Sequence, residues 1–218
     1  RIQYGDRLDI KTLAREFGVS PMPIRDAIKK LEAENLVVVR PRSNCYVRMP
    51  THAEVLQAVE SRQMLEMFAV EKACRVVTRE DLRRLEKVVD RMSELVAAAE
   101  DSKEPVPEYI ELDHQFHAEI CRLAGNEYVE RFYRQTSLHL SMSYRYGVTM
   151  CHGLRATFVE HRAIYRHLAS NSDMAVKVMR EHLERARRNL LKEHELQEAE
   201  DADRGAHGRT PRTLERAG

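Results

Sequence analysis

The chain has 218 residues, of which 43% are hydrophobic and 33% are charged. This length suits one large domain or two small ones, each able to bury a core, which excludes a wholly disordered chain. No apolar run is long enough to cross a bilayer, and the first residues lack the apolar stretch of a secretory signal, so we expect a cytoplasmic protein without membrane contact. The four cysteines are scattered without a Cys-x-x-Cys pair, so neither disulfides nor a thiolate zinc site is predicted.

The near-neutral charge of the chain hides two unlike parts. Residues 1–50 contain 10 Lys and Arg against 6 Asp and Glu, whereas residues 51–218 contain 26 against 29. A small basic part suggests nucleic acid as its partner. Only 8 Gly and 7 Pro occur, and residues that favour helices are abundant, so the chain is predicted to be mainly α.

Two short helices are predicted in the basic part. Residues 10–17 carry apolar side chains at helical spacing, and Gly18 then tolerates the left-handed conformation that ends a helix. Ser20 and Pro21 follow as an N-cap and a first helical residue. The second helix repeats the apolar spacing over residues 24–31, so the two form a helix-turn-helix.

Two β-prone stretches, residues 36–40 and 45–48, follow and are predicted to form a two-stranded wing. The major groove admits one helix, whose first turns approach the base edges, so Arg25 is placed to reach guanine or a phosphate. Arg40 and Arg42 on the wing favour phosphate or minor-groove contact. The alternative for each is a solvated charge on a small α/β domain.

These residues resemble the winged helix-turn-helix of GntR-family bacterial transcriptional regulators. The motifs are Phe17-Gly18-Val19-Ser20 and Pro23-Ile24-Arg25-Asp26-Ala27-Ile28, and the resemblance covers most of residues 5–48. It implies binding to double-stranded operator DNA, with Arg25 as the recognition-helix arginine and Lys11 at a phosphate-contacting position. The complete set of residues expected to contact DNA is Lys11, Ser20, Met22, Arg25, Lys29, Arg40 and Arg42.

The resemblance has two departures and one gap. Pro21 stands where the family usually has a DNA-contacting arginine, and Ser43-Asn44-Cys45 stands where a glycine normally forms the tip of the wing. The operator sequence is therefore not carried over from the family. The chain also begins where the family's first helix would just have ended, so we expect that helix to be missing from residues 1–50.

Residues 51–198 are predicted to form an all-α antiparallel bundle of about six helices. The breakers between them include Thr78, Pro105-Val106-Pro107, Gly125-Asn126 and Gly153. A mobile tail is expected over residues 199–218, where apolar residues are few. The helices are expected over residues 52–75, 79–100, 106–124, 127–147, 154–170 and 172–198.

Polar residues interrupt three apolar stripes of this bundle. Asp113 and His117 share the stripe of the third helix, His161 lies on that of the fifth and His182 on that of the sixth, whereas His114 is predicted to point away. Polar groups on a core face are costly without a partner. Three imidazoles and one carboxylate suit Zn²⁺ or another borderline divalent ion.

Two other interpretations stay open at this point. The histidines can be ordinary core residues, each satisfied by one hydrogen bond. The same four residues can also form the metal centre of a hydrolase or oxygenase, because an open metal position activates water. Against an enzyme, no general base is apparent, since Glu119 and Glu160 are displaced from the stripes.

The bundle resembles the FCD ligand-binding domain found behind GntR winged helices. The motifs are Asp113-His114-Gln115-Phe116-His117, Glu160-His161-Arg162-Ala163-Ile164 and Glu181-His182-Leu183, and the resemblance covers about residues 52–192. It implies a metal held by Asp113, His117, His161 and His182, most readily Zn²⁺, with Ni²⁺ or another divalent ion as alternatives.

The resemblance also implies a small organic-acid effector bound beside the metal. Arg62 matches the family's cavity arginine, and its alternative is a salt bridge with a glutamate of the bundle. Tyr144 and Arg145 are weaker candidates for the effector site, and Asn126 is expected to cap a helix. The expected protein is a homodimeric, metabolite-responsive regulator and not an enzyme.

Overall fold

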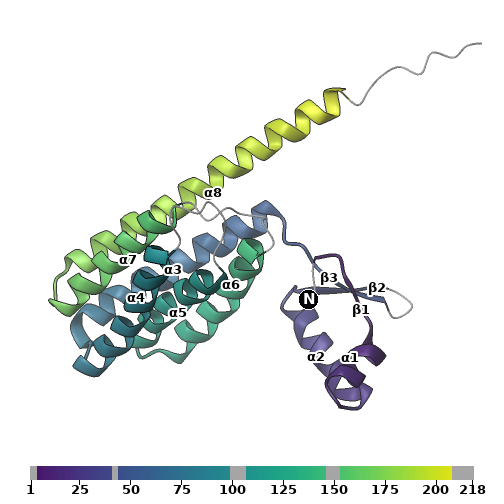
Figure 1. Ribbon diagram of the computed structural model, residues 1–218, viewed down its shortest axis with the longest axis horizontal. Coiled ribbons are helices and arrows are strands. Elements are labelled where there is room, and N and C mark those ends of the chain that lie inside the picture. The colour runs from purple at the N-terminus through teal and green to yellow at the C-terminus, as the bar shows by residue number, and fades with distance from the viewer. Residues whose placement is uncertain (1–3, 41–43, 99–106, 146–152, 208–218) are drawn as a thin grey trace, which may run out of the picture.

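The computed structural model describes residues 4–40, 44–98, 107–145 and 153–207. Two regions follow one another along the chain: a small region of two helices and three strands, and a larger region that is entirely helical (Figure 1). The mainly α fold expected from the composition is confirmed. Among the described residues, no helix combines the length and apolar character needed to cross a membrane.

The small region is a helix-turn-helix backed by a sheet. Helix α1 spans Ile10–Glu16 and α2 spans Pro21–Ala33, and the strands are β1 (Arg7–Leu8), β2 (Val37–Arg40) and β3 (Asn44–Val47). The strand order is β1-β3-β2, with both pairs antiparallel. The predicted wing is confirmed as β2 and β3, and β1 adds a strand that the sequence did not indicate.

The turn between α1 and α2 has the predicted chemistry. Gly18 has a φ of 65°, in the left-handed region that favours glycine, and Ser20 is the N-cap of α2 with Pro21 next. Ser20 has an extended backbone and makes no side-chain capping hydrogen bond. A small core forms below the turn from Leu8, Ile28, Val37, Cys45 and Val47.

The larger region contains six helices within the described residues, as predicted. Helix α8 continues past the predicted end at residue 198, so the first part of the expected tail is helical, and residues 208–218 lie outside the described residues. The helices are α3 (His52–Val76), α4 (Arg79–Ala98), α5 (Pro107–Leu123), α6 (Glu127–Arg145), α7 (Leu154–Ala169) and α8 (Met174–His207).

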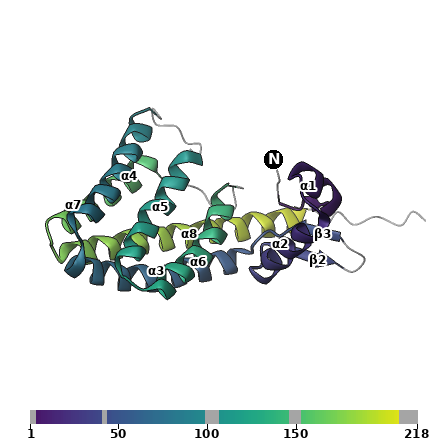
Figure 2. The same cartoon turned by 90° about the horizontal axis from the view of Figure 1, so that it is seen from below.

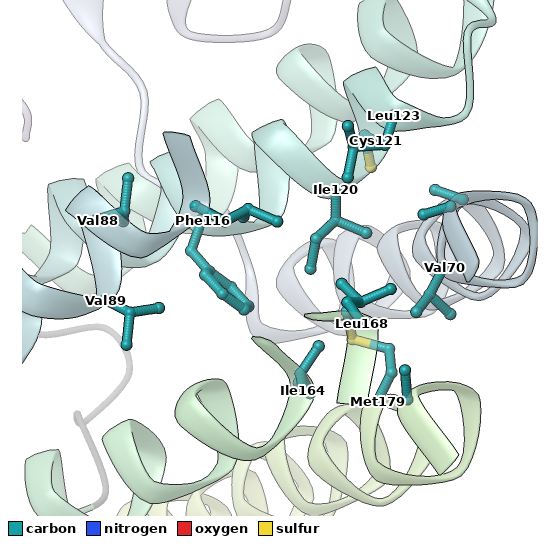
Figure 3. Packing of buried hydrophobic residues seen from close by; sticks show 14 of the residues in the cluster. Val70, Val88, Val89, Phe116, Ile120, Cys121, Leu123, Ile164, Leu168 and Met179 are labelled. Atoms are coloured by element: carbon teal, nitrogen blue, oxygen red, sulfur yellow. The ribbon is translucent and has the colours of Figure 1, made fainter. Parts of the chain in front are cut away.

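All six helices α3 to α8 contribute buried side chains to the core of the bundle. Helix α3 packs against α5, α6 and α8, whereas α4 packs against α5 and α7 (Figure 2). Phe116 and Ile120 from α5 meet Ile164 and Leu168 from α7 and Met179 from α8, and all five are fully buried (Figure 3). This packing fixes the inward faces of the helices that carry the candidate ligands.

An ion pair connects the two regions at the start of α3. The guanidinium of Arg48 contacts the carboxylate of Glu54 and also donates to the backbone oxygen of Asn35, at 3.4 Å. Glu54 in turn forms a capping box with Thr51, the N-cap of α3. The carboxyl-terminal side of the wing is thus attached to the first turn of α3.

Candidate functional site

Three histidines converge in the buried centre of the helical region. His117 on α5, His161 on α7 and His182 on α8 are all buried, the first two completely. The Nε2 atom of His117 lies 3.1 Å from Nε2 of His161 and 3.2 Å from Nε2 of His182. The structure therefore brings together the three imidazoles that the sequence placed on separate helices.

This spacing fits a shared metal ion. Two nitrogens that bind one ion at about 2.0–2.1 Å lie about 3.0 Å apart at a right angle and about 3.4 Å apart at a tetrahedral angle. Burial, the largest effect, lowers the pKa of His117 and of His161 well below the ordinary value, so both rings are neutral and keep a lone pair for a cation. A fourth donor is near, because Oδ1 of Asp113 lies 3.4 Å from Nε2 of His161.

Asp113 remains ionised in this setting. Burial acts to raise the pKa of Asp113, but its interactions with the neighbouring His117 and His161 rings and with the Arg62 guanidinium outweigh burial and lower the pKa below its ordinary value. A carboxylate and three imidazoles form the donor set that divalent metals of the zinc type prefer.

Two glutamates lie against the outer ring nitrogens of the histidines. Glu160 on α7 has Oε2 2.7 Å from Nδ1 of His182, and Glu66 on α3 has Oε2 2.5 Å from Nδ1 of His117, although the second contact lacks hydrogen-bond geometry. A carboxylate at Nδ1 directs the Nε2 lone pair inward, as outer partners of metal-bound histidines do. Sequence analysis missed both roles.

Glu160 was predicted to be displaced from the site, and the structure corrects this. Its side chain reaches from α7 to α8, where it accepts from Nδ1 of His182 at 2.7 Å and from Nε and Nη2 of Arg185 at 2.5 and 2.6 Å. Burial tends to raise its pKa, but these hydrogen bonds prevail and bring the pKa to about 2. The usable signal was Arg185, which follows His182 at i+3 on the same helix face.

Arg62 forms a salt bridge with a glutamate of the bundle, Glu66, which was the alternative role expected for it. It is buried, its Nε pairs with Glu66, and its Nη2 lies 3.9 Å from Oδ2 of Asp113 without any hydrogen bond among the described residues. One edge of the guanidinium is thus held by a glutamate, and the other faces the candidate ligand Asp113. The salt bridge does not remove Arg62 from the site.

His114 departs from its predicted position. Its ring is partly buried near Arg62 and Glu66, and neither ring nitrogen has a hydrogen-bond partner in the described part of the chain. Burial lowers the pKa of His114 below the ordinary value. The sequence placed it beside Glu111, but it did not show that α3 covers this side of α5.

The remaining candidates of the helical region have mixed outcomes. The expected capping role of Asn126 is confirmed, since its Oδ1 accepts from the backbone N–H of Tyr128 at 3.0 Å. Tyr144 and Arg145 lie in the last turn of α6, and their side chains are outside the described part of the structure.

The outer face of α2 presents the predicted DNA contacts. Met22, Arg25 and Lys29 are exposed and follow one another at i, i+3 and i+7, with Asp26 3.8 Å from Lys29. The opposite face, with Ile24, Ile28 and Leu31, packs into the domain core. An exposed helix face that carries Arg25 in its first turns and Lys29 one turn further on is suited to a major groove.

The other DNA candidates surround α2. Lys11 on α1 and Ser20 in the turn are exposed, and the guanidinium of Arg40 lies over the ring of Tyr46, 5.1 Å from its centroid. The stacked ring gives Arg40 a fixed place on the wing. Arg42 lies outside the described residues. The DNA-contacting roles of these residues stay predictions.

Comparisons with known proteins agree with both regions. The pattern of the FCD domain matches residues 54–185, and that of bacterial regulatory proteins of the gntR family matches residues 1–47. The chain is 26% identical over 222 residues to the Uxu operon regulator of Haemophilus influenzae, covering 90% of this chain and 77% of that protein. It is also 26% identical over 174 residues to the uncharacterized HTH-type transcriptional regulator YdhC of Bacillus subtilis, covering 79% and 75%.

Among solved structures, E. coli McbR/YncC shares the fold, with a TM-score of 0.74 at 19% identity over 88% of this chain and 90% of that one. The fold, the exposed helix-turn-helix and the matches define a DNA-binding transcriptional regulator and not an enzyme. The chain belongs to the GntR family of bacterial regulators, in the group with an FCD domain. The hydrolase or oxygenase interpretation is therefore wrong.

Proposed function

We propose that this regulator holds a divalent metal ion through Asp113, His117, His161 and His182, and that a small carboxylate bound beside the metal changes its affinity for operator DNA. Zn²⁺ is the first candidate, with Ni²⁺ or another divalent ion as alternatives. The observation that carries the proposal is the convergence of three buried Nε2 atoms, with His117 at 3.1 and 3.2 Å from its two neighbours.

Hydrogen bonds among the rings satisfy this cluster poorly. His117 Nε2 faces two other Nε2 atoms, and a neutral imidazole has only one N–H to donate. Where Glu160 takes the Nδ1 proton of His182, the Nε2 atom of His182 is an acceptor, and His117 Nε2 has at most one proton for the two nitrogens that it faces. A cation between them removes this conflict, and Asp113 offsets its charge.

Arg62 supports a carboxylate as the effector. Its Nη2 is buried, lacks a hydrogen-bond partner within the described chain and lies beside Asp113, so the free edge of a planar donor faces the ligand cluster. A guanidinium binds carboxylates in a bidentate manner. The metal, when bound, supplies open coordination positions for one oxygen of the same ligand.

Helix α3 supplies a physical route from this site to the DNA. It carries Arg62 and Glu66 in its middle, and its first turn carries Glu54, whose partner Arg48 follows the wing. A displacement of α3 on effector binding would therefore move the wing. Effector binding alters DNA occupancy only if it favours one arrangement of two DNA-binding domains, so we propose a homodimer on a two-half-site operator.

Metal analysis and ligand screening of the purified protein test the proposal. We expect one divalent ion per chain, and a higher melting temperature with certain mono- or dicarboxylates only when Zn²⁺ is present, because a ligand that prefers the native state stabilises it. Arg62→Lys keeps the positive charge but loses the planar guanidinium with its two parallel N–H donors. It should therefore reduce the rise in melting temperature caused by the carboxylate and leave the metal content unchanged. Protein without metal, or a response that is independent of metal, would contradict the proposal.

The regulatory step needs a DNA measurement. An operator fragment selected from a random library by the full chain gives the probe, and fluorescence anisotropy gives its affinity. Addition of an active carboxylate should change this affinity in wild-type protein and change it less in Arg62→Lys.

A further inference from the structure

His114 on α5 carries two polar atoms that the proposed metal site does not use. Its ring is partly buried, and Nδ1 and Nε2 both lie away from solvent without a hydrogen-bond partner among the described residues. Buried polar atoms in proteins are almost always hydrogen-bonded, because an unpaired one costs free energy. This side chain is therefore a candidate for contact with a ligand.

His114 lies beside the groups proposed to hold the effector. It follows Asp113 directly and precedes His117 by three residues, so it shares a side of α5 with His117. Helices α3, α5 and α6 all pack against one another. Arg62, from α3, is near enough to the His114 ring to interact with it electrostatically, and Nη2 of Arg62 is likewise buried without a hydrogen-bond partner in the described part of the chain. The free edge of Arg62 and the ring of His114 thus lie close together in the same part of the bundle.

Tyr133 on α6 holds this turn of α5 in place. Its side chain is almost completely buried, and its hydroxyl donates to the backbone oxygen of His114 at 3.4 Å. The hydroxyl of Tyr133 thus serves the backbone and not the ring of His114. Because the backbone is held, a ligand that binds the ring has less conformational freedom to remove.

Among the groups common in small organic acids, a hydroxyl suits His114 best. A hydroxyl both donates and accepts, so it pairs with either ring nitrogen whichever of them carries a proton. A second carboxylate only accepts, and it would lie near the negative charges of Asp113 and Glu66, which interact with the same ring. An apolar group would leave both nitrogens unpaired.

We propose that His114 is a specificity-determining residue of the effector site, and that it binds a hydroxyl group of an effector whose carboxylate is held by Arg62. The inference rests on the proposed function and narrows the effector from small carboxylates to hydroxy acids. An acid without the hydroxyl still meets Arg62 and the metal, but it leaves the nitrogens of His114 unpaired, which is how a polar site rejects an analogue.

Matched pairs of acids test the inference on the full chain loaded with Zn²⁺. L-Lactate and propionate, L-malate and succinate, and 3-hydroxybutyrate and butyrate each differ by one hydroxyl, and the rise in melting temperature with concentration gives the affinity. In at least one pair we expect the hydroxy acid to bind at least about 10-fold more tightly to wild type. His114→Leu should reduce this preference to about two-fold or less, with the affinity for the plain acid and the zinc content unchanged.

The variant is needed because a hydroxyl beside a carboxylate can also bind the metal. A preference that comes from the metal alone survives in His114→Leu, whereas one that comes from the ring is lost. His114→Gln retains a donor and an acceptor and should keep part of the preference, and Gln115→Leu, at an exposed neighbouring position on α5, should behave as wild type. Circular dichroism and metal analysis show that each variant is folded and loaded, and His114→Met takes the place of His114→Leu where the latter does not fold.

The outcomes separate this inference from the proposed function. If both members of every pair bind equally to wild type, or if the preference survives in the folded, loaded His114→Leu, the role of His114 is overturned while the carboxylate effector stands. If none of these acids stabilises the zinc-loaded wild type, the proposed effector function fails and the inference fails with it.

Discussion

The two functional regions of this protein place their charged groups in opposite environments. The DNA candidates of α2 and the wing lie on the surface, whereas Arg62, Glu66 and the three histidines of the helical region are buried. A surface group can be removed with little effect on folding, because water replaces its partner. A buried polar group needs every partner in place, so recognition and stability are coupled there.

The largest effect should come from a change within the buried cluster. His161→Ala removes one ring nitrogen from the proposed ligand set, so we expect loss of bound metal and of the stability that binding confers, about 2.7 kcal/mol at a free metal concentration of 100 times Kd. Metal analysis and thermal unfolding with and without chelator measure both effects. His167→Ala on the same helix is the matched control, and equal metal content in the two variants would disprove the assignment.

The surface region should show a large effect on binding without one on folding. Arg25→Ala should weaken operator binding by about 1–3 kcal/mol, as for an arginine that contacts a base edge, and leave the unfolding of the helical region unchanged. Anisotropy titrations on the selected operator measure the loss. Arg166→Ala removes an exposed arginine of the helical region and should bind normally; wild-type affinity in Arg25→Ala would move the base contact elsewhere.

A change to an outer partner should have an intermediate effect. Glu160→Gln removes the carboxylate that faces Nδ1 of His182, so metal affinity should fall by about 10–100-fold, although all four proposed ligands remain. Competition with a fluorescent chelator gives the affinity. Glu181→Gln, beside His182 in sequence but exposed, is the control, and an unchanged affinity in Glu160→Gln would make that glutamate a purely structural partner.

The smallest effect should come from the ion pair between the regions. Glu54→Gln retains an acceptor for the capping box but loses the charge that faces Arg48, so it should destabilise the protein by about 0.2–1 kcal/mol at pH 7. Hydrogen bonds from Arg48 and Thr51 lower the pKa of Glu54 from 4.5 to about 2. The stabilising contribution is therefore complete above pH 4.5 and is lost as the pH falls towards 2.

Urea unfolding of wild type and Glu54→Gln between pH 7 and pH 3 tests the direction of this pH dependence. The difference in unfolding free energy should shrink as the pH falls. A difference that grows at low pH would show that Glu54 acts through another group.

The sequence determined the helices and their inward faces with few errors. Apolar spacing gave six helices behind a helix-turn-helix, and the same spacing showed that Asp113, His117, His161 and His182 face a core. The limits of α8 and the short strand β1 were not found. Strand β1 has only two residues, Arg7–Leu8, too few for a period of two to stand out, and α8 continues through residues with no apolar stripe.

Only the tertiary structure decided which side chains meet. Periodicity fixes the direction of a side chain around its own helix axis, but it carries no information about which helix lies opposite. The Nε2 spacing, the burial of His114 against α3 and the contacts of Glu66 and Glu160 all depend on the packing of α3, α5, α7 and α8. The proposed ligands could thus be predicted from the sequence, whereas the glutamates that contact their rings depend on how the helices pack.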